Sequence, residues 1–267
     1  MEQINAVITT FLQNSEHSRS EKMQFDPIDI MNDLEGELTE CDCRKCKNKG
    51  VIYKRIYGYE TAIDCECMEI RRAMRLIKRS GLKDAFEKCT FDSFEASRDY
   101  QQDMKNTALR YIKNYEGSWF FIGGQVGSGK THICTAIVKY LLEEYKMPAK
   151  YMQWREEVPK IKAMVNTPDY EKELDKWKKI KVLYIDDMFK TEQGRSPTTA
   201  DINLAFEIIN YRYINNDLVT IISSEKTVAE MVSIDESVGS RIFEKAKNYC
   251  VSVSKDITRN YRLKELM

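Results

Sequence analysis

The sequence is poor in histidine, in net charge and in long apolar stretches. Lys+Arg and Asp+Glu each number 42 among 267 residues, so the chain has no overall basic field, and any nucleic-acid contact has to come from local patches. No stretch approaches the roughly 18 apolar residues that span a membrane. Residues 1–5 lack the basic start of a signal peptide, so we expect a cytoplasmic protein without a membrane partner. The two histidines are His17 and His132, and we assign neither a catalytic role.

Cysteine, in contrast, occurs eight times, and five of the eight fall between positions 41 and 67. In a reducing compartment, clustered cysteines bind metal more often than they form disulfides. Cys43 and Cys46 make a C-x₂-C knuckle, and Cys65 and Cys67 follow it after a segment that reads as a hairpin around Gly58. Four thiolates in this order predict a structural Zn²⁺ site, without which so small a segment would hardly fold. Cys41 is an alternative to Cys43 as a ligand.

A glycine-rich loop lies between an apolar strand pattern at 118–122 and a helical pattern at 133–141. Its residues are Gly124, Gln125, Val126, Gly127, Ser128, Gly129, Lys130 and Thr131. Glycines let backbone N–H groups approach phosphates, and the following helix N-terminus adds a positive dipole. We expect Lys130 to reach the β- and γ-phosphates, Thr131 to ligate Mg²⁺, and His132 to lie beside the nucleotide on the first helical turn.

A second apolar run, 181–185, ends in Asp186 and Asp187. This is the Walker B arrangement, in which the first carboxylate holds Mg²⁺ and the next residue orients the attacking water. That second residue is usually Glu. Aspartate is one methylene shorter, so we expect Asp187 to support only slow hydrolysis of ATP.

Residues 41–267 resemble the DnaC/DnaI helicase-loader family of AAA+ ATPases, with the IstB transposition ATPases as relatives. The resemblance rests on the order of the four cysteines, 90–94, the glycine-rich loop, 185–187, 206–213 and 239–241. It implies an α/β fold: an AAA+ P-loop NTPase with a parallel sheet flanked by helices, plus a small N-terminal zinc-binding module. The alternation of strand and helix patterns over 101–267 independently favours that sheet.

The expected domains are an N-terminal helical segment (1–40), a zinc-binding helicase-interaction module (41–79), a linker (80–100) and the AAA+ ATPase domain (101–267). Ile4, Val7, Ile8, Phe11 and Leu12 form an apolar stripe on the first segment. That stripe suits a helix that docks on its own protein or in a partner's groove.

The resemblance also implies roles for three residues of the later motifs. Ser224 follows an apolar strand pattern at 219–223 and is expected to sense the γ-phosphate, with Glu225 as an alternative and a simple turn-forming serine as another. Arg241, in a helix expected to begin at 239, looks like an arginine finger that reaches a neighbouring subunit's nucleotide; a surface ion pair is the alternative. Arg262 is similar to a residue that senses nucleotide from the C-terminal side.

The resemblance therefore implies an ATP-dependent loader that grips a hexameric DnaB-type replicative helicase and delivers it to single-stranded DNA. A nucleotide-dependent homo-oligomer is expected. Basic residues at 71–79 and on the cysteine segment could contact the DNA backbone, or form a solvated surface. The alternatives are an IstB-like regulator of transposition, an adaptor switched by nucleotide with little turnover, and a small-molecule kinase.

Overall fold

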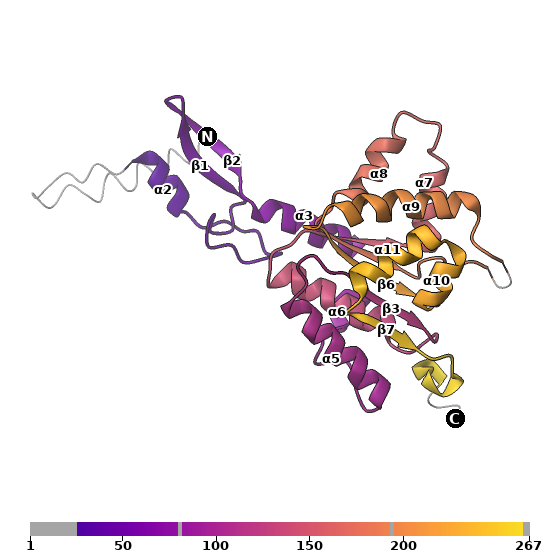
Figure 1. Cartoon of the computed structure of the whole chain (residues 1–267). Helices are drawn as coiled ribbons and strands as arrows, with labels where there is room; N and C mark the ends of the chain where they lie inside the picture. The colour runs from indigo at the N-terminus through magenta and orange to yellow at the C-terminus, as the bar shows by residue number, and fades with distance from the viewer. Residues whose placement is uncertain (1–25, 80–81, 193–194, 264–267) are drawn as a thin grey trace, which may run out of the picture. The chain divides into compact units, whose positions relative to one another are not determined.

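The computed structural model describes residues 26–79, 82–192 and 195–263, and Figure 1 shows its elements. The apolar helix expected at 4–12 lies outside the described residues. The described chain forms two compact units: residues 26–38 with 43–65, and residues 39–42 with everything from 66 onward. Within these residues, no helix is both long and apolar enough to cross a membrane.

The first unit consists of helix α2 (Pro27–Asp33) and the antiparallel hairpin of β1 (Val51–Ile56) and β2 (Tyr59–Asp64). The two turn residues, Tyr57 and Gly58, both have positive φ angles, 51° and 83°. A two-residue turn of this kind matches the right-handed twist of the strands on either side. The hairpin expected around Gly58 is therefore confirmed.

The second unit begins with three helices and continues as alternating strands and helices. Its elements are α3 (Cys67–Arg79), α4 (Lys83–Lys88), α5 (Asp99–Lys113), β3 (Phe120–Gly124), α6 (Lys130–Glu143), β4 (Ala149–Gln153), α7 (Trp154–Lys162), α8 (Tyr170–Lys178), β5 (Val182–Asp186), α9 (Thr199–Ile214), β6 (Val219–Ser224), α10 (Val228–Ile234), α11 (Glu236–Ala246), β7 (Cys250–Val253) and the 3₁₀ turns η1 (Ile257–Arg259) and η2 (Tyr261–Leu263).

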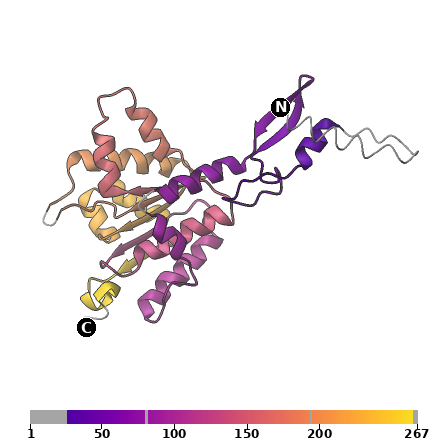
Figure 2. The same ribbon diagram turned by 180° about the vertical axis from the view of Figure 1, so that it is seen from behind.

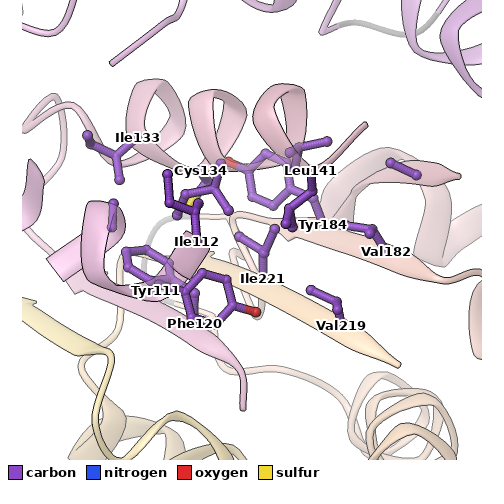
Figure 3. Packing of buried hydrophobic residues seen from close by; sticks show 14 of the residues in the cluster. Tyr111, Ile112, Phe120, Ile133, Cys134, Leu141, Val182, Tyr184, Val219 and Ile221 are labelled. Atoms are coloured by element: carbon purple, nitrogen blue, oxygen red, sulfur yellow. The ribbon is translucent and has the colours of Figure 1, made fainter. Parts of the chain in front are cut away.

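The five strands of this unit form one parallel sheet in the order β4-β5-β6-β3-β7. Side chains alternate along each strand, so Val182 and Tyr184 join one apolar cluster while Leu183 and Ile185 join another. The first cluster includes α5 and α6, and Figure 3 shows Tyr111 and Ile112 of α5 packed with Ile133 and Leu141 of α6 over the strands. The second includes α7 to α11. The expected parallel sheet with helices on both faces is confirmed.

The segment from 82 to 98 is part of this core and not a free linker. Leu82, Phe86 and Phe94 are each at most 5% exposed and pack with the α5 and α6 cluster. The boundary expected at residue 101 therefore differs from the structure, because these apolar side chains bury themselves against the sheet's helices. Likewise α11 begins at Glu236, capped by the Asp235 side chain, and not at 239 as expected.

The C-terminal turns of the chain contact the start of α5. The turns η1 and η2, in yellow, lie beside one end of α5 in both views (Figure 1 and Figure 2). Arg98 donates a hydrogen bond to the Thr258 carbonyl, and the Tyr100 hydroxyl donates to the Arg259 carbonyl at 3.3 Å. These contacts hold the C-terminal turns next to the sheet edge that carries the glycine-rich loop.

Candidate nucleotide site and cysteine cluster

The glycine-rich loop connects β3 to α6, as the sequence predicts. Gly129 caps α6 with a φ of 96°, and Gly127 has a φ of 72° with Asn260 directly against it. A Cβ on Gly127 would lie 1.9 Å from Asn260 Oδ1, so only glycine fits there. The Tyr261 backbone N–H donates to the Gly127 carbonyl at 2.9 Å. The C-terminal turns therefore brace the loop from outside.

A pocket of about 210 Å³ opens at the start of α6. It is lined by Val126, Gly127, Gly129, Lys130, Thr131, His132, Asp187, Lys190, Glu225 and Arg262. Six of these are in the nucleotide-binding set expected from the loop and its first helical turn. Gly124, Gln125 and Ser128 form the back of the loop, where the buried Ser128 hydroxyl donates to the Gln125 carbonyl at 2.9 Å.

Lys130 lies at the centre of the pocket with its ammonium held by the loop. Its Nζ donates to the Gly124 carbonyl at 3.0 Å and to the Gln125 carbonyl at 2.6 Å. Burial lowers the pKa of Lys130, while the negative charges of Asp187 and Glu225 act in the opposite direction. A desolvated cation aimed along a backbone loop suits a phosphate ligand.

Asp186, at the end of β5, is only 6% exposed, and its carboxylate accepts hydrogen bonds from four hydroxyl groups. Tyr184 donates to Oδ1 at 2.7 Å and Tyr151 to Oδ2 at 2.9 Å; Thr131 lies 3.3 Å from Oδ1, and Ser223 also donates to Oδ1. The two residues expected to hold Mg²⁺, Thr131 and Asp186, are therefore neighbours. Oxygen ligands of this kind fit Mg²⁺, directly or through water.

Tyr151, Tyr184 and Ser223 were not identified from the sequence, although they orient the Asp186 carboxylate. Burial, followed by the charge of Asp186, raises the pKa of Tyr151 and of Tyr184, so both keep their protons and act as donors. Tyr184 could have been found, because it precedes Asp186 by two residues on a strand and so shares its face. Tyr151 could not, because it comes from the neighbouring strand by register.

Asp187 lines the pocket in a backbone conformation that few residues adopt, with a φ of 54°. Its carboxylate pairs with Lys190 at 2.8 Å, and Lys190 also pairs with Glu225 at 2.7 Å. Burial alone would lower the pKa of Lys190, but the hydrogen bonds and charges of Asp187 and Glu225 outweigh it and raise that pKa. Neither Lys190 nor its bridging position was expected from the sequence.

Ser224 is fully buried and its hydroxyl is used within the fold. Its Oγ donates to the Met188 carbonyl at 2.7 Å and accepts the Lys226 backbone N–H at 3.0 Å. It does not line the pocket, whereas its neighbour Glu225 does. Of the two residues, Glu225 is therefore the one that lines the candidate nucleotide pocket, and the Ser224 hydroxyl is used within the turn.

Arg241 lies on α11 and does not line the pocket of its own chain. Its guanidinium stacks 5.2 Å from the centre of the Phe206 ring and 5.5 Å from that of Tyr213, and donates to the Ser237 carbonyl at 2.8 Å. Among the described residues it forms no ion pair, which was the alternative. The finger role of Arg241 on a neighbouring subunit stays a prediction. Arg262, in contrast, does line the pocket.

The sulfur atoms of Cys43, Cys46, Cys65 and Cys67 all lie within 4.8 Å of one another. Cys43 Sγ and Cys65 Sγ are 3.7 Å apart, far beyond the roughly 2.0 Å of a disulfide. Tetrahedral Zn²⁺ with Zn–S bonds of about 2.3 Å would separate sulfurs by about 3.8 Å, so the group fits zinc. The Gly50 backbone N–H donates to Cys46 Sγ at 3.3 Å.

Cys41 does not belong to this group, which decides the alternative ligand set in favour of Cys43. Cys41 packs against the core of the second unit, and its carbonyl accepts a hydrogen bond from the Arg71 guanidinium at 2.7 Å. Arg71 is fully buried, with Glu40 at 3.2 Å, and Glu40 also pairs with Arg75 at 2.9 Å. The interpretation of Arg71 as a DNA-backbone contact is therefore wrong, because its charge is used inside the protein.

Comparisons with known proteins agree with this geometry. Residues 86–246 match the bacterial DnaA ATPase domain. The chain is 34% identical over 209 residues to the uncharacterized protein YqaM of Bacillus subtilis, covering 74% of this chain and 66% of YqaM. It is 31% identical over 234 residues to the phage-like element PBSX protein XkdC of the same organism, covering 82% and 85%. This chain therefore spans just under two thirds of the length of YqaM.

The resemblance to DnaC/DnaI-type proteins is confirmed. The replicative helicase loader DnaC of Buchnera aphidicola (subsp. Acyrthosiphon pisum) is 29% identical over 73 residues, 27% of this chain and 30% of that protein. The crystal structure of the DnaC helicase loader aligns with a TM-score of 0.54 at 20% identity over 64% of this chain and 98% of its own. That of DnaI aligns with a TM-score of 0.52 at 19% identity, over 64% and 93%. These structures share the AAA+ fold expected from the sequence.

Proposed function

Since the chain belongs to the family of the bacterial DnaA ATPase domain, we propose that it is an ATP-dependent loader of a DnaB-type replicative helicase. The observation that carries this proposal is one pocket that combines Lys130, Thr131 and Asp187 with the Asp186 carboxylate next to it. The DnaC helicase loader and DnaI share the fold of this chain. The loader would deliver the helicase to single-stranded DNA at the start of replication.

In this pocket, Lys130 and the loop N–H groups bind the phosphates of ATP, while Thr131 and Asp186 hold Mg²⁺. Mg²⁺ bound by these two residues would supply positive charge against the phosphate oxygens. Asp187 orients the attacking water, and Arg262 and Glu225, which also line the pocket, contact the nucleotide. Arg241 of an adjacent subunit completes the site in a nucleotide-dependent oligomer. Because Asp187 is one methylene shorter than the usual glutamate, it positions the attacking water less well, so hydrolysis is slow, and contact with partners stimulates it.

The segment of residues 41–79, which carries the four clustered cysteines, serves as the contact with the helicase. Cys43, Cys46, Cys65 and Cys67 hold Zn²⁺ as a closed structural site, which leaves the ion no open position for catalysis. Tyr57 and Tyr59, at the tip of the hairpin, are 96% and 77% exposed. Exposed aromatic side chains on a small rigid hairpin suit a protein interface.

The test is helicase loading on circular single-stranded DNA. The replicative helicase of the same cell would be mixed with the circle, an annealed tailed oligonucleotide and ATP, and release of the oligonucleotide would be measured. Wild-type protein should increase the release, and Lys130→Ala should not, because it cannot hold the phosphates. Equal release with and without the wild-type protein would contradict the loader proposal.

A further inference from the structure

Lys190 lines the nucleotide pocket, yet none of the motifs accounts for it. Its ammonium lies 2.8 Å from Asp187 Oδ2 and 2.7 Å from Glu225 Oε1, and its side chain is 29% exposed. Both partners also line the pocket. One cation thus links the end of β5, which carries the candidate base, to the end of β6.

The turn that carries Lys190 is fixed by its neighbours. Met188 and Phe189, which precede it, are both fully buried. The Met188 N–H donates to the Ser223 carbonyl at 3.0 Å, and the Ser224 hydroxyl donates to the Met188 carbonyl at 2.7 Å. The Lys190 side chain therefore starts from an anchored backbone, and its bridging position is built by the fold.

The charges of the pocket give this bridge a consequence for nucleotide choice. Asp187 and Glu225 are both anionic and line the same pocket as Lys130. A triphosphate brings further negative charge toward the residue that orients its attacking water, so two uncompensated carboxylates would repel its terminal phosphate. The ammonium of Lys190 lies between the two carboxylates, offsets one of their two negative charges, and donates its hydrogen bond to Asp187 Oδ2.

We propose that Lys190 is a positioning residue that aligns the Asp187 carboxylate for the attacking water and makes the pocket prefer a nucleoside triphosphate over a diphosphate. This inference rests on the proposed ATPase function and adds a determinant of nucleotide choice to it. Lys190 acts through Asp187 and Glu225, and its charge acts on the terminal phosphate, which a diphosphate lacks.

The test is to measure dissociation constants for MgATP and MgADP, together with turnover, in Lys190→Met. We expect ATP binding to weaken by about tenfold or more, since a hydrogen-bonded charge is removed, while ADP binding changes little. Turnover should fall, and adding Asp187→Asn should lower it little further, because the two residues act as one unit. Lys190→Arg should restore most of the ATP preference.

Lys181→Met is the matched control, since Lys181 directly precedes β5 at its other end and pairs with Asp217 at 3.8 Å on the surface. It should bind both nucleotides as the wild type does. An unchanged ATP-to-ADP ratio in Lys190→Met, or an equal loss of both nucleotides, would overturn the proposal. A wild-type protein that binds no ATP would instead overturn the ATPase function itself, and this inference with it.

Discussion

At the scale of single residues, Asp187 stands where related ATPases usually have glutamate. Its φ of 54° lies in the left-handed region, which aspartate and asparagine tolerate better than longer side chains do. The turn therefore gives a physical reason for the shorter acid. The same turn places Lys190 beside Asp187, so the turn explains both the short side chain at this position and its ion pair.

Asp187→Asn should keep the fold and ATP binding but lower turnover by about a hundredfold, as loss of a general base does. Asparagine accepts the same positive φ, so the backbone stays unstrained. Steady-state phosphate release at saturating ATP measures the effect. Turnover at the wild-type level would show that another group orients the water.

Arg241→Ala should preserve ATP binding by the single subunit and lower the turnover of the assembled protein by about a thousandfold, the usual effect of losing an arginine finger. The measurement is turnover as a function of protein concentration. Lys245→Ala is the matched control, because Lys245 lies one helical turn further on and stacks 5.2 Å from the same Tyr213 ring. An equal loss in both variants would indicate damage to α11, not loss of a finger.

Which residues the sequence revealed depends on how local their signals are. Lys130, Thr131 and Asp186 could be predicted because each belongs to a short motif whose chemistry fixes its neighbours. Tyr151 and Lys190 could not, because a strand register and a positive-φ turn bring them to the site. The sequence predicts Ser224 at the pocket, whereas Glu225 lines it. Which of two consecutive side chains at a strand end faces the pocket depends on the fold and cannot be read from the sequence.

At the scale of elements, a buried arginine joins α8, α9 and the sheet. Arg212 of α9 is fully buried, and its guanidinium donates to the carbonyls of Trp177, Lys178, Ile180, Lys181 and Val219 and to the Thr220 hydroxyl. Two of those carbonyls belong to Trp177 and Lys178 in the last turn of α8, where carbonyls have no donor within the helix. One side chain therefore donates to carbonyls of three neighbouring elements or loops at once.

Arg212→Met should lower the free energy of unfolding by about 3 kcal/mol or more, since several buried carbonyls lose their donor. Urea unfolding followed by circular dichroism measures this. Thr220→Val removes only one acceptor at 2.9 Å and should cost about 1 kcal/mol. Equal stability of the wild type and Arg212→Met would mean that water reaches these carbonyls.

Element boundaries were less predictable than element types. The strands and helices around the glycine-rich loop follow from apolar periodicity, which is a local signal. The start of α11 at Glu236 depends on the Asp235 cap, and the packing of 82–98 depends on Phe86 and Phe94 meeting α6 and α5. Those contacts are tertiary, so the sequence indicated a linker where the chain is folded.

At the scale of the whole molecule, the two units make different demands on stability. The second unit has a parallel sheet with apolar clusters on both faces. In the described residues, the first has one helix and one hairpin. A two-stranded hairpin is marginal in water, so we propose that a metal ion at the cysteine cluster stabilises the first unit.

Cys46→Ser should therefore lose zinc and helicase binding while the ATPase unit stays folded and binds ATP. Elemental analysis of the purified protein measures zinc, and nucleotide titration measures the second unit. Cys41→Ser is the matched control and should keep one zinc per chain, because Cys41 lies outside the cluster. Stoichiometric zinc in Cys46→Ser would rule out the proposed ligand set.

In the proposed function, this protein binds a replicative helicase under the control of ATP. The most direct measurement is size-exclusion chromatography with light scattering of the protein mixed with the replicative helicase of the same cell, with and without ATP. We expect a complex of defined mass whose formation depends on nucleotide and is altered in Lys130→Ala. Two folded proteins that elute separately under every nucleotide condition would contradict it.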